Sequence, residues 1–160
     1  MQSEIDHEQH MGSALLPTLP AQSTLPAAPA PQTEEWKSKP VMLLVEDNYI
    51  NTLTIGRILK DVCIVEHAEG AVTALTMAAQ KRYDVILMDI NLGAGMTGVE
   101  AVEVLRRMPE YSTVPIAAVT GYTFPEDKAK FLSQGFTHHL SKPFDREDIL
   151  ALAYELLQYR

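Results

Sequence analysis

Five side chains that could bind a metal ion or a phosphate follow short apolar runs of this sequence. They are, in chain order, Glu46, Asp47, Asp89, Thr120 and Lys142. Carboxylate oxygens bind hard cations, a hydroxyl can donate a hydrogen bond to an anion, and an ammonium group can pair with a phosphoryl oxygen. Each of these residues alone is commonplace at the end of a strand. A site is predicted only if the fold brings them together.

The charges of this set narrow its chemistry. At an effective dielectric of about 20, two carboxylates about 4 Å apart repel by roughly 4 kcal/mol, which a divalent cation would relieve. An all-oxygen set without Cys or His favours a hard ion such as Mg²⁺, which is often shared with a phosphoryl group. Asp89, at the centre, is then expected to be a nucleophile that forms an aspartyl phosphate. Lys142 would pair with one phosphoryl oxygen, and the Thr120 hydroxyl would donate to another.

The elements that would position these residues follow from the apolar pattern. Short, wholly apolar runs are typical of strands covered on both faces, and segments of helical length separate them. The expected strands are Val41–Val45, Val62–Val65, Val85–Met88, Val114–Val119 and His138–Ser141. Five strand-and-helix units in about 120 residues predict an α/β fold with a parallel sheet and helices on both faces.

Helices are expected between and after these strands. The third should run from Thr97 to Met108, the fourth should begin near Pro125 and stop at Gly135, and the last should have Asp145 as its N-cap. For a doubly wound sheet of this size we expect the flavodoxin-like strand order 2-1-3-4-5. Strands 1, 3, 4 and 5 are then neighbours, so the five candidate side chains should converge beyond the carboxyl ends of the strands.

The first 39 residues differ in composition from the rest. Six of the ten prolines lie before Val41: Pro17, Pro20, Pro26, Pro29, Pro31 and Pro40. Proline lacks a backbone donor and blocks helix and sheet, so residues 1–39 are predicted to form a disordered Pro/Ala-rich tail or linker. Residues 40–160 are predicted to form one domain.

Charge and hydropathy argue against several other functions. A net charge of −8 opposes nucleic-acid binding, because phosphates would be repelled. No apolar run approaches the roughly 20 residues that span a bilayer, and acidic residues stand where a secretory signal would be basic. Cys63 is the only cysteine and cannot form an intramolecular disulfide. We expect a cytoplasmic protein that does not insert into membranes.

Four segments resemble the signature blocks of response-regulator receiver domains, in that family's order and approximate spacing. They are residues 45–48 (Val-Glu-Asp-Asn), 87–91 (Leu-Met-Asp-Ile-Asn), 119–121 (Val-Thr-Gly) and 140–144 (Leu-Ser-Lys-Pro-Phe). The resemblance, which covers roughly residues 40–160, implies a Mg²⁺ site formed by Glu46, Asp47, Asp89 and the backbone carbonyl of Asn91. It also implies that Asp89 is phosphorylated. The remaining implied roles are a hydroxyl switch at Thr120 and a phosphate-binding Lys142, followed by a cis peptide to Pro143.

The resemblance also implies partners and a way of signalling. The phosphoryl donor would be a histidine kinase or a histidine phosphotransfer protein. Phosphate on Asp89 would draw in Thr120, let His139 turn inward, and reshape the face of the fourth helix, fifth strand and fifth helix. No output domain follows the last helix, so the readout is expected to be an unknown downstream protein, a homodimer through this face, or an output in a longer parent chain. Beyond its own phosphorylation and slow dephosphorylation, no enzyme activity is expected.

Three positions depart from the family pattern. The loop of residues 91–98 is one residue longer than the common form and lacks its proline. Gly121 stands where the family usually has alanine, and His139 stands where a switching Tyr or Phe is usual. An imidazole can rotate as those rings do, but it also titrates near neutrality. The alternative for His139 is a partly exposed strand histidine without a role.

Other functions are possible for the same fold. The main alternative is an interaction module that keeps the receiver fold and acts without phosphorylation, which the lengthened loop leaves open. A phosphatase of the haloacid-dehalogenase kind would need a second Asp where Asn91 stands. A flavin phosphate would be repelled by Glu46 and Asp47.

Overall fold

The computed structural model of the chain describes residues 39–121 and 125–159, and for residues 125–128 it describes the backbone only. Nearly all of the predicted tail lies outside these ranges, so its disorder and the domain boundary at residue 40 stay predictions. None of the described helices is both long and apolar enough to cross a membrane.

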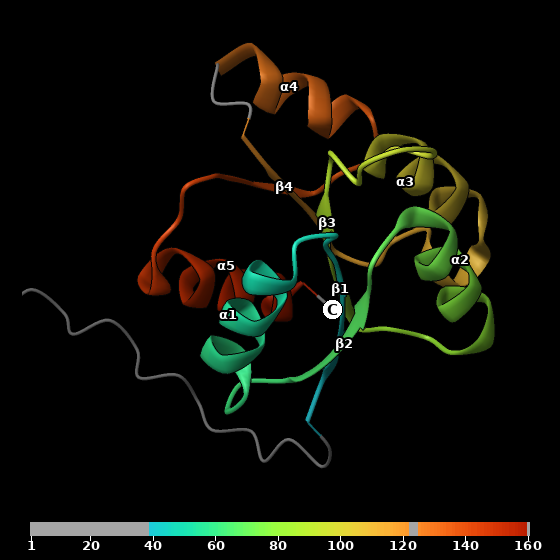
Figure 1. Ribbon diagram of the computed structural model, residues 1–160. Coiled ribbons are helices and arrows are strands. Elements are labelled where there is room, and N and C mark those ends of the chain that lie inside the picture. Colours follow the sequence, from blue (N-terminus) through green and yellow to red (C-terminus); the bar gives the residue numbers. More distant parts are fainter. Residues whose placement is uncertain (1–38, 122–124, 160) are drawn as a thin grey trace, which may run out of the picture. The chain divides into compact units, whose positions relative to one another are not determined.

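Strands and helices alternate along the described chain (Figure 1). The elements are β1 (Val41–Val45), α1 (Tyr49–Leu59), β2 (Ile64–Ala68), α2 (Ala71–Gln80), β3 (Val85–Asp89), α3 (Gly98–Arg107), the 3-10 turn η1 (Pro109–Tyr111), β4 (Ile116–Thr120), α4 (Pro125–Ser133), β5 (His138–Ser141) and α5 (Arg146–Gln158). The five strands pair in parallel in the order β2-β1-β3-β4-β5. The predicted α/β class and strand order are confirmed.

Two apolar cores cover the two faces of the sheet. On one face, α1 and α5 pack over side chains such as Leu44 and Leu87, and Ile55 and Leu156 fill the space between. On the other face, α2 and α3 pack over the alternate side chains of the same strands, joined by Phe131 of α4. Figure 1 shows α1 and α5 side by side to one side of the strands, and α2 and α3 to the other. Because both faces are covered, the central strands carry unbroken apolar runs.

The second strand begins later than predicted. The sequence predicted Val62–Val65, whereas β2 runs from Ile64 to Ala68. The N–H groups of Val62 and Cys63 both donate to the carbonyl of Leu59, so these two residues belong to the turn that closes α1. Their apolar side chains pack inward from that turn, which is why they resembled a strand. The predicted start of β4 at Val114 was early for a related reason, since Val114 and Pro115 are buried before the strand begins at Ile116.

Helix ends follow the sequence signals closely. Asp145 caps α5 and exchanges hydrogen bonds with Asp148, and Thr97 caps α3 in the same reciprocal way with Glu100. Gly135 follows α4 with a φ of 98°, a left-handed conformation that favours glycine. The predicted N-cap and stop residues are confirmed, and α3 itself starts one residue later than expected because Thr97 is its cap.

Gly98, the first residue of α3, lies against the end of β3. Its N–H donates to the carbonyl of Ile90 at 3.1 Å, and a β-carbon at this position would lie only 2.1 Å from the backbone oxygen of Asp89. The start of α3 can therefore rest on the end of β3 only if residue 98 is glycine.

We predict that Gly98→Ala destabilises the domain by about 1–3 kcal/mol or more, since the new methyl group meets backbone that cannot rotate away. The measurement is chemical denaturation. The matched control is Gly56→Ala within α1, where a β-carbon meets nothing within 4 Å. That change should stabilise the domain by roughly 0.5–1 kcal/mol. Equal effects of the two substitutions would contradict the close approach at Gly98.

Candidate metal and phosphoryl-transfer site

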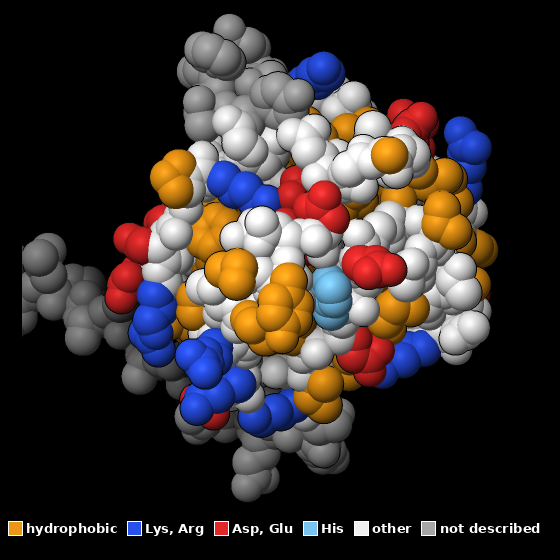
Figure 2. All heavy atoms as spheres, in the orientation of Figure 1, with side chains coloured by type: hydrophobic (Ala, Val, Ile, Leu, Met, Phe, Trp, Pro, Cys, Tyr) orange, Lys and Arg blue, Asp and Glu red, His pale blue; other side chains and the backbone are white. Residues whose placement is uncertain are grey.

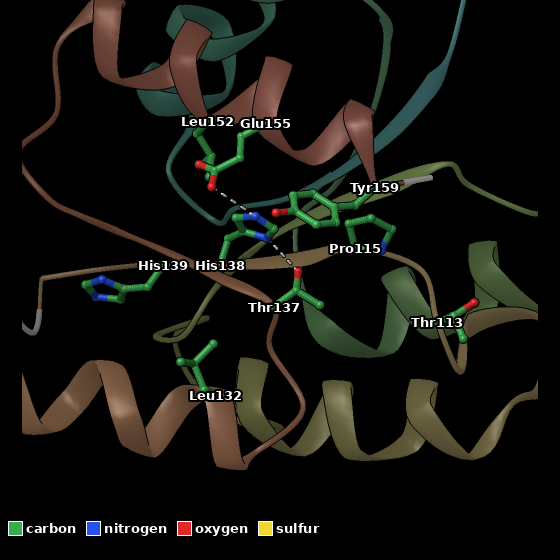
Figure 3. Close-up of a pocket in the computed structure, with 9 residues that line it drawn as sticks. All are labelled: Thr113, Pro115, Leu132, Thr137, His138, His139, Leu152, Glu155 and Tyr159. Carbon is green, nitrogen blue, oxygen red and sulfur yellow. Dashed lines mark hydrogen bonds and ion pairs between the residues drawn. The ribbon is translucent and has the colours of Figure 1, made fainter.

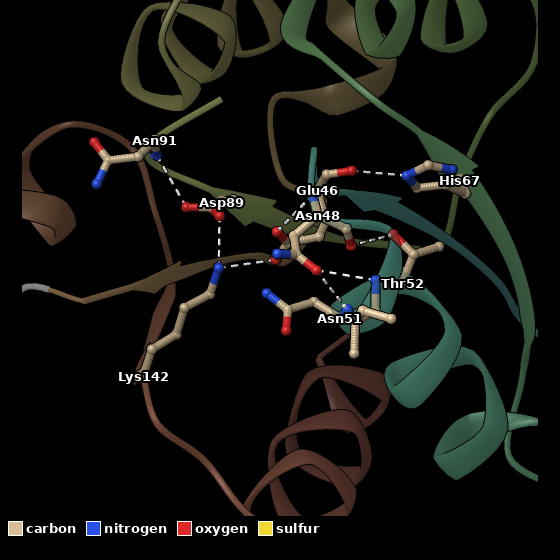
Figure 4. A network of polar contacts seen from close by, with 9 residues as sticks. Glu46, Asn48, Asn51, Thr52, His67, Asp89, Asn91 and Lys142 are labelled. Carbon is tan, nitrogen blue, oxygen red and sulfur yellow. Dashed lines mark hydrogen bonds and ion pairs between the residues drawn. The ribbon is translucent and has the colours of Figure 1, made fainter. Parts of the chain in front are cut away.

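The five candidate side chains lie at one edge of the sheet (Figure 4 shows three of the residues). Glu46 and Asp47 directly follow β1, Asp89 ends β3, Thr120 ends β4, and Lys142 follows β5. Carboxylate oxygens of Glu46, Asp47 and Asp89 all lie within 4.8 Å of one another. Four of the five side chains, those of Glu46, Asp47, Asp89 and Lys142, therefore lie close together. Thr120 ends the neighbouring strand β4 at the same edge of the sheet.

Lys142 connects two of the three carboxylates. Its Nζ lies 2.6 Å from Asp89 Oδ2 and 2.8 Å from Glu46 Oε2. Glu46 is 1% exposed and Asp89 is 5% exposed, so this ion pair is largely removed from water. Buried charges have lost hydration, and removal of one partner typically destabilises a protein by about 3–5 kcal/mol. Loss of the Lys142 ammonium group would therefore leave two buried carboxylates without a positive partner.

The site still disfavours negative charge on Asp89. Burial raises the pKa of its carboxyl group, and the hydrogen bonds from Lys142 and from the N–H of Asn91 only partly oppose that effect. Burial also lowers the pKa of Lys142, but its hydrogen bonds to Asp89 and Glu46 outweigh burial and leave that pKa raised. Lys142 is therefore held as a cation, and Asp89 lacks full compensation for its charge.

The link between β1 and α1 helps to orient the side chain of Glu46. The N–H of Asn48 donates to Glu46 Oε1 at 3.1 Å, while Asn48 Oδ1 accepts from the N–H groups of Ile50 and Asn51. Asn48 is thus the N-cap of α1 and a support for Glu46 at once. Sequence reasoning did not single it out, although an Asn immediately before a helix is a recognised capping signal.

The loop after Asp89 closes over the same edge. The N–H of Asn91 donates to Asp89 Oδ1 at 2.9 Å, and both Gly93 and Gly95 have positive φ angles, 70° and 109°. A β-carbon on Gly93 would lie 3.4 Å from Asp47 Oδ2, so the lengthened loop comes close to the acidic pair. Asn91 is placed beside Asp89 through its N–H, and its carbonyl stays a predicted metal ligand.

The predicted switch residues lie on β4 and β5. Thr120 is fully buried, and its backbone carbonyl accepts from the N–H of Lys142 at 2.7 Å. The ring of His139 stacks on Phe131 of α4, with centroids 5.6 Å apart and planes 16° from parallel. Its Nε2 is buried, with no hydrogen-bond partner among the described residues. His139 therefore connects β5 to α4, and a rotation of its ring would change this contact with the helix.

His138 and His139 have different surroundings although they are adjacent (Figure 3). His138 lies toward α5, where its Nε2 is 3.5 Å from Glu155 Oε1 and its ring meets Tyr159 edge-on. These groups line a surface pocket of about 590 Å³ at the outer edge of β5.

Beyond β5, the peptide bond from Lys142 to Pro143 is cis, as the resemblance implied.

The comparisons with known proteins agree with this geometry. The family model described as the response regulator receiver domain matches residues 42–154. The chain belongs to this family. As a receiver domain of two-component signalling, it is 34% identical over 133 residues to the signal transduction histidine-protein kinase BarA of Escherichia coli strain K12. That match covers 81% of this chain and 14% of BarA, so the chain spans only a small part of its curated relative.

Further receivers with solved structures share the fold. The chemotaxis response regulator CheY4 of Vibrio cholerae is 33% identical, with a TM-score of 0.71 over 75% of this chain and all of CheY4. The receiver domain of the sensor histidine kinase PA1611 from Pseudomonas aeruginosa PAO1 is 30% identical, with a TM-score of 0.68 over 76% of this chain and 99% of that domain. The PA1611 structure has a magnesium ion coordinated in its active-site cleft.

We predict that Asp47→Asn raises the free energy of unfolding of the metal-free receiver by up to about 1 kcal/mol, because it removes one of three crowded negative charges. Thermal or urea denaturation in EDTA measures the effect. Added Mg²⁺ should then stabilise the wild-type receiver and have little effect on the variant, since a bound ligand stabilises only a protein that retains its site.

The matched control is Asp61→Asn, an exposed carboxylate in the turn after α1. It should change stability by less than about 0.5 kcal/mol and leave the response to Mg²⁺ intact. If Asp47→Asn instead lowered stability in EDTA, the idea of repulsion within the acidic cluster would be wrong.

Proposed function

We propose that this receiver accepts a phosphoryl group on Asp89 from a phosphohistidine protein in a Mg²⁺-dependent reaction, and that the phosphate switches an interaction surface. The observation that carries the proposal is the position of the Lys142 ammonium, hydrogen bonded to Asp89 and Glu46, beside a third carboxylate. An ion pair needed only for stability would not require the exposed Asp47 at the same edge.

The donor set fits Mg²⁺. Glu46, Asp47 and Asp89 offer only carboxylate oxygens, and the carbonyl of Asn91 would add a fourth oxygen ligand. Oxygens on opposite sides of a Mg²⁺ ion lie about 4.2 Å apart, so a cluster within 4.8 Å needs only a small contraction. When bound, the ion would stabilise the negative charge of the transferring group.

The side chains of the receiver have separate tasks in this reaction. A carboxylate oxygen of Asp89 attacks phosphorus and forms the new P–O bond, while the P–N bond to the donor imidazole breaks and its electron pair returns to the ring nitrogen. Lys142, which already contacts Asp89 Oδ2, moves to a phosphoryl oxygen as the carboxylate charge is lost. The hydrogen bond from the N–H of Asn91 holds the other carboxylate oxygen in place.

The product would be sensed by Thr120 and His139. The Thr120 hydroxyl is proposed to donate to a phosphoryl oxygen and pull the end of β4 toward the site. His139, which already stacks on Phe131, would follow and move α4 relative to β5. A population shift of this kind needs both states to exist beforehand, with phosphate favouring one through its additional contacts. The altered α4-β5-α5 face would bind a downstream protein or a second copy of the domain.

The decisive test is direct phosphorylation of the purified domain. Incubation with acetyl phosphate and Mg²⁺ should add the mass of one phosphoryl group in an acid-stable, base-labile linkage. The gain should be absent in EDTA and in Asp89→Asn, because the variant has no carboxylate nucleophile. Intact-protein mass spectrometry measures both.

Asp61→Asn is again the control and should be modified like the wild-type domain. A phosphoryl group that persists in Asp89→Asn would overturn the assignment of this residue. No mass gain in the wild-type domain, together with no binding of beryllofluoride, would favour an interaction module that acts without phosphorylation.

An exposed apolar patch beside the site is where we propose that the donor protein docks. Tyr49, Ile50 and Leu53 are all exposed although they are large and apolar, and they occupy the first turns of α1 directly after Asp47 and Asn48. Figure 2 shows apolar side chains gathered in the region that α1 occupies in Figure 1. Apolar side chains grouped in this way are typical of surfaces that bind another protein.

We predict that Ile50→Lys slows phosphorylation by the cognate phosphohistidine protein at least about tenfold, since a buried anchor lost from a docking surface typically costs more than 1 kcal/mol. Phosphorylation by acetyl phosphate should be unchanged, because this small donor needs no docking surface. Rates with the two donors, measured side by side, separate docking from chemistry.

Val72→Lys is a closely matched control. Val72 is 67% exposed and Ile50 is 66% exposed, but Val72 lies on α2. It should leave both rates unchanged. Equal slowing by the two variants, or slowing with acetyl phosphate, would rule out specific docking on α1.

A further inference from the structure

His67 lies on the edge strand β2 and contacts the acidic site through the backbone. Its Nε2 is 2.7 Å from the backbone carbonyl oxygen of Glu46 (Figure 4). A carbonyl oxygen can only accept a hydrogen bond, so Nε2 must carry the proton and donate it. The side chain itself is exposed, and a surface imidazole would not be held in this orientation by packing.

The carbonyl that His67 contacts belongs to the peptide between Glu46 and Asp47. The peptide is a rigid plane, so the relative direction of the two carboxylates depends on the ψ angle of Glu46 and the φ angle of Asp47 on either side of it. A hydrogen bond to the Glu46 carbonyl restricts that ψ angle. The direction of this peptide therefore affects both acidic side chains at once. Asp47 is exposed, so its orientation depends on this backbone more than on packing around its side chain.

The end of β2 holds Glu46 by both of its backbone groups. The N–H of Glu46 donates to the carbonyl of Ala68 at 3.1 Å, and the carbonyl of Glu46 accepts from His67. The first contact continues the ladder between β1 and β2 and would form with almost any sequence. The second depends on a long side chain with a donor at its tip.

We propose that His67 is a positioning residue of the site, which holds the Glu46–Asp47 peptide so that both carboxylates face Asp89. This inference rests on the proposed function, because the arrangement matters only if a cation is bound there. His67 touches neither the phosphoryl group nor the cation. It acts through the backbone, whereas the groups that orient metal ligands in many proteins hydrogen-bond to the ligand side chains themselves.

The first measurement is Mg²⁺ affinity, by NMR or calorimetric titration of the whole chain without any phosphoryl donor. His67→Ala should weaken Mg²⁺ binding about tenfold, in the range found when a supporting hydrogen bond to a metal site is lost. His67→Gln, whose amide can donate to the same carbonyl, should restore most of the affinity. At saturating Mg²⁺, the rate of phosphorylation of His67→Ala by acetyl phosphate should approach that of the wild-type chain.

His138→Ala is the matched control. It removes a histidine from the other edge strand, β5, where the imidazole contacts Thr137, Glu155 and Tyr159. Mg²⁺ affinity should not change in this variant. Circular dichroism spectra that match the wild-type spectrum would show that both alanine variants are folded.

A second measurement does not need the metal. In the Mg²⁺-free chain, ¹⁵N relaxation of the Asp47 and Asn48 amides should show increased motion in His67→Ala and not in His67→Gln. Unchanged Mg²⁺ affinity in His67→Ala would overturn the inference while leaving phosphorylation of Asp89 intact. If the wild-type chain bound no Mg²⁺, the proposed function would fail, and unchanged relaxation would still show separately that His67 does not order this peptide.

Discussion

The structure of this receiver depends on one interaction, the contact of a single ammonium group with two buried carboxylates. Lys142 directly follows β5 and contacts Asp89 at the end of β3 and Glu46 just after β1. The contact therefore connects the ends of these three strands across the sheet. Burial strengthens the attraction because little water screens it, and it raises the penalty for any charge left over. The charge left over is negative, since the site has three carboxylates.

This excess of negative charge connects the fold to the proposed chemistry of the site. Burial raises the pKa of Asp89, so negative charge on this residue is disfavoured in the folded site, and a bound cation would reduce that penalty. The cation would matter still more after phosphorylation, because an aspartyl phosphate carries more negative charge than the carboxylate it replaces. Gly98 and the N–H of Asn91 meanwhile keep the residue in place from the side of α3. A carboxylate held in place beside one ammonium group and two further carboxylates suits the proposed phosphoryl acceptance once a cation offsets the excess negative charge.

Much of this could be predicted from the sequence, and the physical reason is periodicity. Buried strands such as β1 and β3 carry unbroken apolar runs, and the strand order then determines which loop residues meet. Val62 and Cys63 were assigned wrongly because apolar side chains in a buried turn resemble a strand. His67 was missed for a different reason. Its contact with Glu46 joins a side chain to a backbone carbonyl, and every residue has such a carbonyl, so no residue type in the sequence indicates the contact.

The position of His139 could be predicted, but its environment could not. Spacing from Lys142 placed it where the family usually has an aromatic ring, and the structure adds that it stacks on Phe131 with a buried Nε2. A Phe ring in this place would present only carbon and hydrogen to α4, whereas the imidazole has a buried Nε2 with no hydrogen-bond partner among the described residues. Burying such an atom without a partner is unfavourable by about 1–3 kcal/mol. Stacking on Phe131 offsets part of this penalty, so the ring of residue 139 should be held less firmly here than a Phe ring would be in the same place.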